Sequence, residues 1–232
     1  MLTQKTSIGL LLFVVFVSSA AFAMQSWQTA FAVGAKDLAT VGENPYFILK
    51  PGYLLTFANN DTPTPDTLVI TVLNETKVVG GIEARIVEER ETAHGEVVEV
   101  SRNYFAINPQ TSDVYYLGED VDMYKKGKVV NHEGSWHHGE NGATLGLMMP
   151  GKPAVGAKFY QEQAKGVAMD RFEIVSLTEK LATKAGVFDR CLRAKETTPL
   201  EPLVRDYKIY APGVGLIKDG DLLLVSHGYA SR

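Results

Sequence analysis

Short runs of β-branched and aromatic residues, separated by turn-forming residues, recur along most of the chain. The clearest strand-like runs are residues 68–73, 96–101, 114–117, 170–176, 204–210 and 222–226. Turn pairs such as Gly80-Gly81, Lys126-Gly127 and Asp219-Gly220 stand between them. Helical periodicity is confined to residues 28–38, which could form a short helix or a loose tail. The pattern predicts a mostly β protein built of antiparallel meanders.

The chain also resembles itself at an offset of about 105 residues. Residues 81–92 and 186–197 share the same residue at four of twelve positions, and residues 50–57 resemble 154–161 at a similar offset. Unrelated meanders can share such a strand–turn rhythm, which is the alternative interpretation. A true repeat predicts two related units that form either a sandwich or one curved half-barrel-like sheet.

This repeat suggests a division of the chain into five parts. We expect a signal peptide (1–23), an N-terminal extension (24–45), a first β unit (46–119), a connecting insert (120–149), and a second β unit with a C-terminal strand (150–232). The insert is of most interest, because loops that bridge structural units often carry binding residues.

The first residues have the pattern of a secretory signal peptide. Lys5 provides a positive charge, residues 8–17 are apolar, and Ala21-Phe22-Ala23 matches a cleavage site, so cleavage is expected after Ala23. An uncleaved N-terminal anchor is the alternative. No later apolar stretch is long enough for a transmembrane helix. We therefore expect a soluble protein of the periplasm or the extracellular space.

Charge and cysteine content narrow the function further. Without Lys5 the 23 basic residues become 22, against 27 acidic residues. This balance disfavours nucleic acid, whose binding depends on clustered lysine and arginine. The single cysteine, Cys191, cannot form an internal disulfide, and the repeat aligns it with Ile86, so we expect it to be a small core residue.

The sequence HEGSWHHGEN, residues 132–141, lies inside the insert and holds three of the five histidines. It resembles the zinc-protease motif H-E-x-x-H, but the second histidine is one position too late for both to face one side of a helix. A loop could still bring His132, His138 and Glu140 together as zinc ligands. The alternatives are solvated or hydrogen-bonding histidines beside a packed Trp136, and a non-metal ligand site formed by Trp136, His137 and His138.

Other catalytic or metal-binding patterns fit poorly. A calcium loop starting at Asp120 would need glycine at its sixth position and glutamate at its twelfth, where the chain has Lys125 and Asn131. Asp120 and Asp122 instead fit one face of a solvated hairpin, balanced by nearby lysines. No G-x-S-x-G, phosphate-binding or dinucleotide-binding motif occurs. The strand glutamates are expected on solvated faces; they are Glu88, Glu89, Glu91, Glu96 and Glu99.

Several phrases together resemble a family of uncharacterised exported bacterial β-rich proteins. They are NPYF at 44–47 followed by Pro51-Gly52, GSW at 134–136, Met149-Pro150, and YAPGVGLIK at 210–218. The resemblance implies an extracytoplasmic bacterial setting and no established activity. The two positions after the tryptophan are not typically histidines in that family, so the resemblance implies no metal role for His137 and His138.

These observations favour a non-enzymatic protein that binds a ligand or an envelope partner in the crease between two related units. We expect no cofactor under this interpretation. The alternative is a metal-binding protein or metal-dependent hydrolase that uses zinc at His132 and His138 with a nearby carboxylate. A third hypothesis is a structural subunit of an envelope assembly.

Overall fold

The computed structural model describes residues 26–59 and 65–229, so the predicted signal peptide lies outside the described residues. No helix in these two ranges is long and apolar enough to cross a membrane. The short helix considered for residues 28–38 is reduced to one 3-10 turn, η1 (Ala35–Asp37). The rest of that segment has no regular helix, and it touches the main sheet through two isolated bridges, at Gln28 and Ala39.

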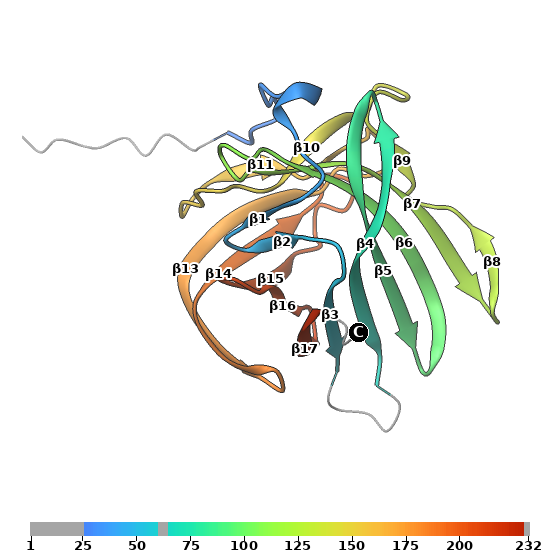
Figure 1. The fold of residues 1–232 in the computed structure, drawn as a ribbon. Coiled ribbons are helices and arrows are strands. Elements are labelled where there is room, and N and C mark those ends of the chain that lie inside the picture. The colour runs from blue at the N-terminus through green and yellow to red at the C-terminus, as the bar shows by residue number, and fades with distance from the viewer. Residues whose placement is uncertain (1–25, 60–64, 230–232) are drawn as a thin grey trace, which may run out of the picture.

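Most of the chain forms one antiparallel sheet, as the sequence predicts (Figure 1). The strands run in the order β11-β13-β14-β15-β16-β17-β3-β4-β5-β6-β7-β10-β12, and β8 and β9 also pair with β7. Their bounds are β3 (Tyr53–Ala58), β4 (Thr67–Val79), β5 (Ile82–Ala93), β6 (Glu96–Ile107), β7 (Val114–Lys125), β8 (Lys128–Asn131), β9 (Trp136–His137), β10 (Thr144–Met149), β11 (Lys158–Tyr160), β12 (Glu162–Gln163), β13 (Arg171–Thr183), β14 (Gly186–Thr197), β15 (Asp206–Ala211), β16 (Gly215–Asp219) and β17 (Leu222–Tyr229). A separate small sheet consists of β1 (Gly42–Asn44) and β2 (Phe47–Leu49).

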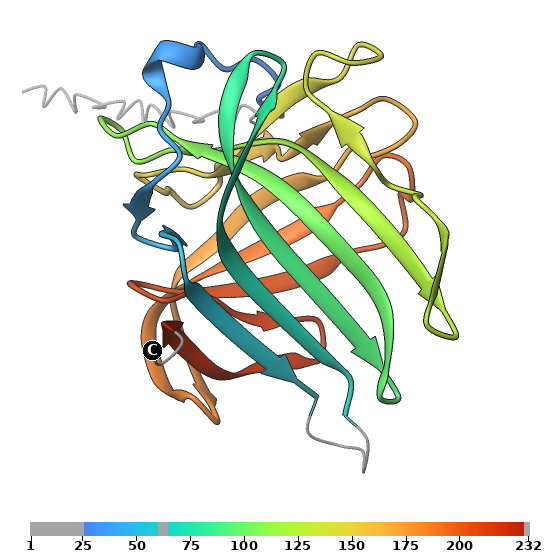
Figure 2. The same ribbon diagram turned by 45° about the vertical axis from the view of Figure 1, so that its right-hand side comes forward.

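The large sheet curls around until it is nearly closed, so the curved single sheet, and not the sandwich, is the architecture (Figures 1 and 2). Strand β17 pairs with β3 and thereby joins the C-terminal half of the chain to the N-terminal half. The other two ends of the sheet meet where β10 passes β11 and β12. A Cβ atom on Gly146 of β10 would lie 2.1 Å from the Gln161 carbonyl oxygen, so this approach requires glycine.

The strands on the two sides of the β17–β3 junction have matching lengths. Strands β4 and β13 each contain 13 residues, and β5 and β14 each contain 12. Both pairs begin 104 residues apart, at 67 and 171 and at 82 and 186. The common origin of the halves stays a prediction. The expected boundary at residue 119 falls inside β7, so the insert begins within a wall strand.

The interior of the curved sheet is apolar near β3 and β13. Phe57 and Leu68 face each other across β3 and β4, and both are buried, as is Phe172 on β13. Cys191 is fully buried and unpaired, which confirms its predicted core role. Because successive side chains of a strand point to opposite faces, inward residues such as Phe57 and Leu68, together with the strand register, define which residues of the neighbouring strands face inward.

Candidate functional site

Strand β5 carries carboxylates on its inner face. Alternation places Val87, Glu89 and Glu91 together, and the register sets Glu89 between Ile70 of β4 and Ser101 of β6. These neighbours line interior cavities with it. The expectation of solvated strand faces is therefore wrong for Glu89 and Glu99, which line an interior cavity, and for Glu91, which shares the inward face of β5. Glu88 lies on the opposite face of the strand.

Acidic side chains from distant parts of the sequence meet in one interior cavity of about 290 Å³. We call this cavity the acidic chamber; its carboxyl and amino side chains belong to Glu89, Glu99, Glu119, Glu162, Asp170, Glu196 and Lys208. They come from strands β5, β6, β7, β12, β14 and β15 and from Asp170, the residue directly before β13. Strands from both ends of the sheet contribute side chains to this wall. These side chains therefore meet only because the sheet closes on itself.

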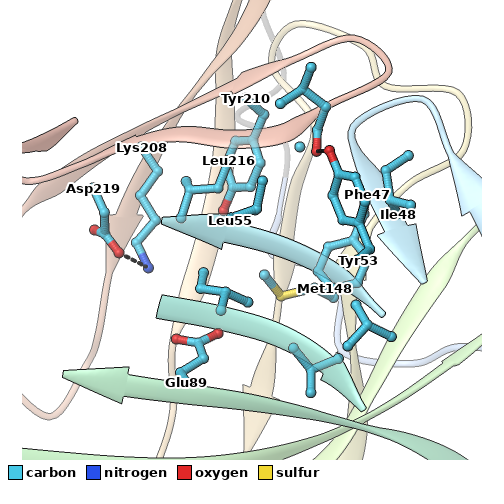
Figure 3. Close-up of a pocket in the computed structure, with 15 residues that line it drawn as sticks. Phe47, Ile48, Tyr53, Leu55, Glu89, Met148, Lys208, Tyr210, Leu216 and Asp219 are labelled. Atoms are coloured by element: carbon cyan, nitrogen blue, oxygen red, sulfur yellow. Dashed lines mark hydrogen bonds and ion pairs between the residues drawn. The ribbon is translucent and has the colours of Figure 1, made fainter. Parts of the chain in front are cut away.

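An apolar pocket of about 70 Å³ adjoins the acidic chamber (Figure 3). Its apolar lining consists of Phe47, Ile48, Tyr53, Leu55, Ile70, Val72, Val87, Val214 and Leu216, with Tyr210 beside them. Figure 3 shows Lys208 and Asp219 on one side of this pocket and Phe47, Ile48 and Tyr53 on the other. Glu89, Met148 and Lys208 line both cavities, so the apolar pocket and the acidic chamber lie side by side in the interior.

Lys208 is the cation of the acidic chamber. Its Nζ lies 3.1 Å from Oε2 of Glu196 and 3.4 Å from Oδ2 of Asp219. Burial disfavours the charged ammonium, but the carboxylates of Glu196 and Asp219 outweigh that effect and raise the pKa of Lys208 well above its ordinary value. Lys208 is therefore a stable positive charge and not a nucleophile or base near neutral pH.

The carboxyl groups respond to the same surroundings in the opposite direction. Burial, with added repulsion from neighbouring carboxylates, raises the pKa of Glu89 to about 7 and that of Glu119 to about 8. Burial also raises the pKa of Glu162 well above its ordinary value, and that of Asp170 by a smaller shift. The acidic chamber therefore holds bound protons near neutral pH, and it can release them to solvent when a positive charge enters.

Three buried neutral polar residues complete the wall of the acidic chamber: Ser101, Asn103 and Gln161, each about 5% exposed or less. The Asn103 amide donates to the Ser101 hydroxyl oxygen at 3.2 Å, and the Tyr116 hydroxyl donates to the Asn103 amide oxygen. The Gln161 amide donates to the Met148 carbonyl oxygen at 3.2 Å. These hydrogen bonds hold the polar side chains of this wall in place.

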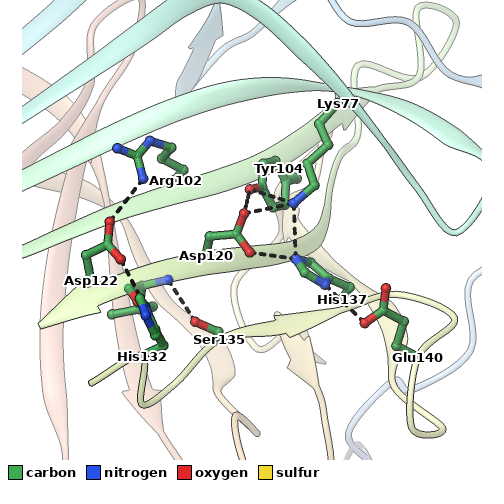
Figure 4. A network of polar contacts seen from close by, with 10 residues as sticks. Lys77, Arg102, Tyr104, Asp120, Asp122, His132, Ser135, His137 and Glu140 are labelled. Carbon is green, nitrogen blue, oxygen red and sulfur yellow. Dashed lines mark hydrogen bonds and ion pairs between the residues drawn. The ribbon is translucent and has the colours of Figure 1, made fainter. Parts of the chain in front are cut away.

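Strands β8 and β9 of the insert pair along the edge of β7, and Asp120, which follows the inward Glu119, points outward from β7 (Figure 4). His137 lies between two carboxylates, with Nε2 2.9 Å from Asp120 and Nδ1 3.2 Å from Glu140. Lys77 of β4 pairs with Asp120 at 2.8 Å, and the Tyr104 hydroxyl donates to the same carboxylate. This group, which we call the outer cluster, fastens the insert to the wall.

The structure separates the three proposed zinc ligands. His132 pairs with Asp122 at 2.9 Å, while His138 accepts a hydrogen bond from the Leu145 amide at 3.1 Å, and burial lowers the pKa of His138. Glu140 contacts His137 instead. Within residues 26–59 and 65–229, no group of three or more His, Cys, Asp or Glu side chains is arranged to hold a metal ion. Zinc binding stays a prediction without a preformed site.

Trp136 is a core residue at the edge of a further cavity. It is 5% exposed and packs edge-on against Tyr116, with ring centroids 5.4 Å apart. The further cavity, about 280 Å³, is lined by Trp136, His137 and Glu140 among others, but not by His138. Two of the three predicted ligand-binding residues thus share a cavity wall, and whether they bind a ligand stays a prediction.

Sequence reasoning missed the acidic chamber, although one signal pointed to it. The glutamate shared by the two halves of the repeat is Glu91 in one and Glu196 in the other. Glu196 lines the acidic chamber, and Glu91 shares the inward face of β5 with Glu89. A glutamate kept at equivalent strand positions could have suggested an interior role. Nothing in the local sequence around Lys208 marks it as their partner.

No protein-family model, curated protein or solved structure matches this chain in the comparisons made with each. The resemblance to an exported bacterial family therefore stays an expectation, and the interpretation of the site depends on its own geometry.

Proposed function

We propose that the protein is a non-enzymatic binding protein that holds a small molecule inside its curved sheet, in the apolar pocket and the acidic chamber together. The supporting observation is that the two cavities adjoin, with Glu89, Met148 and Lys208 lining both of them. Sites for small molecules are typically concave and largely apolar, with a few polar groups that orient the ligand. The proposal includes an extracytoplasmic setting, which depends on the signal-peptide pattern of residues 1–23.

Carboxyl groups in the interior lower the stability of the fold, and this supports a functional role for them. Carboxylates are rarely buried without a partner, because the protein must desolvate them or protonate them. A sheet selected for stability alone would fill these inward positions with apolar side chains, as it does at Phe57 and Leu68. Perturbed ionisable groups that converge on a cavity are characteristic of functional sites. Binding is favoured over catalysis because Lys208, the group closest to a nucleophile, is neutralised by its two carboxylates.

Methyl NMR of the full chain titrated with hexan-1-ol tests the proposal. The methyl resonances of Leu55, Ile70 and Val87, which line the apolar pocket, should shift in a saturable way. Ile70→Trp should fill the pocket and weaken binding at least about tenfold. Thr71→Trp is the matched control, because the next residue of β4 points away from the interior and should leave binding unchanged.

Two results would contradict the proposal. One is the absence of saturable shifts in the wild-type protein. The other is equal affinity in wild type and Ile70→Trp, with circular dichroism showing that both variants keep the wild-type fold.

A further inference from the structure

We infer that the ligand of this interior is an organic amine, whose ammonium group binds in the acidic chamber while its apolar part occupies the apolar pocket. This inference rests on the proposed function and names the chemical class of the ligand.

The charge of the acidic chamber is the first argument. Six carboxyl residues line it with a single lysine, and Lys208 is already engaged by Glu196 and by Asp219. Across residues 26–59 and 65–229, no lysine, arginine or histidine forms an ion pair with the remaining members. The members left without a cation are Glu89, Glu99, Glu119, Glu162 and Asp170. A positive charge supplied from outside would complete the site.

The hydrogen-bonding inventory is a second and independent argument. Gln161 is 4% exposed and lines the acidic chamber. Its amide nitrogen donates hydrogen bonds to the carbonyl oxygen and the sulfur of Met148. Its Oε1 accepts no hydrogen bond from the part of the chain that the structure describes. The acidic chamber therefore offers a neutral acceptor beside its carboxylates, and an ammonium group supplies three donors and no acceptor.

The shape of the interior favours an organic cation over a metal ion. Metal ions need several oxygen or nitrogen ligands at fixed short distances, and no such group of three is preformed among the described residues. The carboxyl groups are instead spread over the wall of a cavity of about 290 Å³. The apolar pocket beside Leu55 and Val87 would have no role for a bare cation, whereas it can hold the hydrocarbon part of an amine.

Proton linkage gives the inference a distinctive signature. Burial raises the pKa of Glu89 to about 7 and that of Glu119 to about 8 in the free protein. An ammonium group favours the ionised carboxylates, so binding should expel protons that these groups hold near neutral pH. The affinity for an amine should therefore rise between pH 6 and pH 8, whereas the affinity for a neutral alcohol should stay nearly constant.

Isothermal titration of the full chain with hexylamine, hexan-1-ol and hexanoate at pH 6 and pH 8 tests the inference. At pH 8 hexylamine should bind at least about tenfold more tightly than hexan-1-ol, and hexanoate most weakly. Glu89→Gln and Glu162→Gln should each reduce hexylamine affinity about tenfold without changing that of hexan-1-ol. Glu88→Gln is the matched control, because Glu88 lies on the outer face of β5 beside Arg102 and should change neither affinity.

The possible results distinguish failure of the amine inference from failure of the proposed binding function. If hexan-1-ol binds as tightly as hexylamine at pH 8, the amine inference is wrong while the proposed binding function stands. If none of the three compounds binds, the proposed function fails as well. If Ca²⁺ alone displaces hexylamine at lower concentrations than competing amines do, the site belongs to a metal ion and the inference is overturned.

Discussion

Replacing the inward carboxyl of Glu89 should stabilise the folded protein in a pH-dependent way. Folding raises the pKa of Glu89 from 4.5 to about 7, chiefly by burial. Each unit corresponds to about 1.4 kcal/mol, so ionised Glu89 costs the fold roughly 3 kcal/mol. A carboxyl whose pKa is raised on folding costs nothing below pH 4.5, where both states are protonated. The cost grows between pH 4.5 and 7 and is complete above that range.

Glu89→Gln removes this cost while it keeps the size and polarity of the side chain. Its free energy of unfolding in urea should exceed that of the wild-type protein by about 2–3 kcal/mol at pH 8, and by less than about 0.5 kcal/mol at pH 4.5. Glu88→Gln, on the outer face of the same strand, should show no such difference between the two pH values. A gain for Glu89→Gln that is equal at both pH values, or a loss at pH 8, would refute the argument that Glu89 is buried in the acidic chamber.

Three further outcomes follow from the packing. Lys208→Met should destabilise the fold by about 3 kcal/mol at pH 8 and by less at pH 5, because burial raises the pKa of Glu196 and its protonation removes one of the two charges that Lys208 balances; equal urea midpoint shifts at both pH values would contradict this. Gly118→Ala places a Cβ atom 2.2 Å from the Trp136 carbonyl oxygen at a φ of +132°, so it should cost about 2–3 kcal/mol and shift the tryptophan emission to longer wavelength. His137→Ala should accelerate amide exchange in residues 126–143 while changing global stability by less than about 1 kcal/mol, and unchanged exchange there would argue against the outer cluster as the fastening of the insert.

The strands and their antiparallel pairing were predictable because local sequence determines them. The runs at 96–101 and 114–117 lie within β6 and β7, and the Lys126-Gly127 pair forms the predicted turn between β7 and β8. Both turn residues have positive φ, which glycine adopts without steric cost. These features depend on neighbouring residues alone, so pattern and turn chemistry were sufficient.

The acidic chamber could not be predicted, because it depends on which face of each strand turns inward and on how distant strands pair. Strand β5 has glutamate at both position 88 and position 89, so the alternation of polar and apolar residues gives no contrast that identifies the inner face. The inner face is defined only when β17 pairs with β3 and the sheet closes. That pairing joins residues far apart in the chain, and neither strand carries a local signal for it.

In the insert region, the strand face of the aspartates was predictable from local sequence, but their partners were not. Asp120 and Asp122 were expected on one strand face, and both indeed point outward from β7. The prediction that lysines of the β7–β8 hairpin balance these two carboxylates was wrong. The observed cations are Lys77 of β4 and Arg102 of β6, because ordered neighbouring strands hold these side chains within 2.8 Å and 3.2 Å of the carboxylates. Three histidines close in sequence likewise bind three different partners.

The most direct test of the account is the position of an amine inside the folded protein. Intermolecular nuclear Overhauser effects should be measured between hexylamine and the methyl-labelled full chain at pH 8. The account predicts contacts from the terminal methyl group of hexylamine to the methyls of Leu55, Ile70 and Val87, and contacts from its aminomethyl end to Met148, at the junction with the acidic chamber. Contacts confined to exposed residues such as Val187 or Leu203, or none at all, would contradict the account.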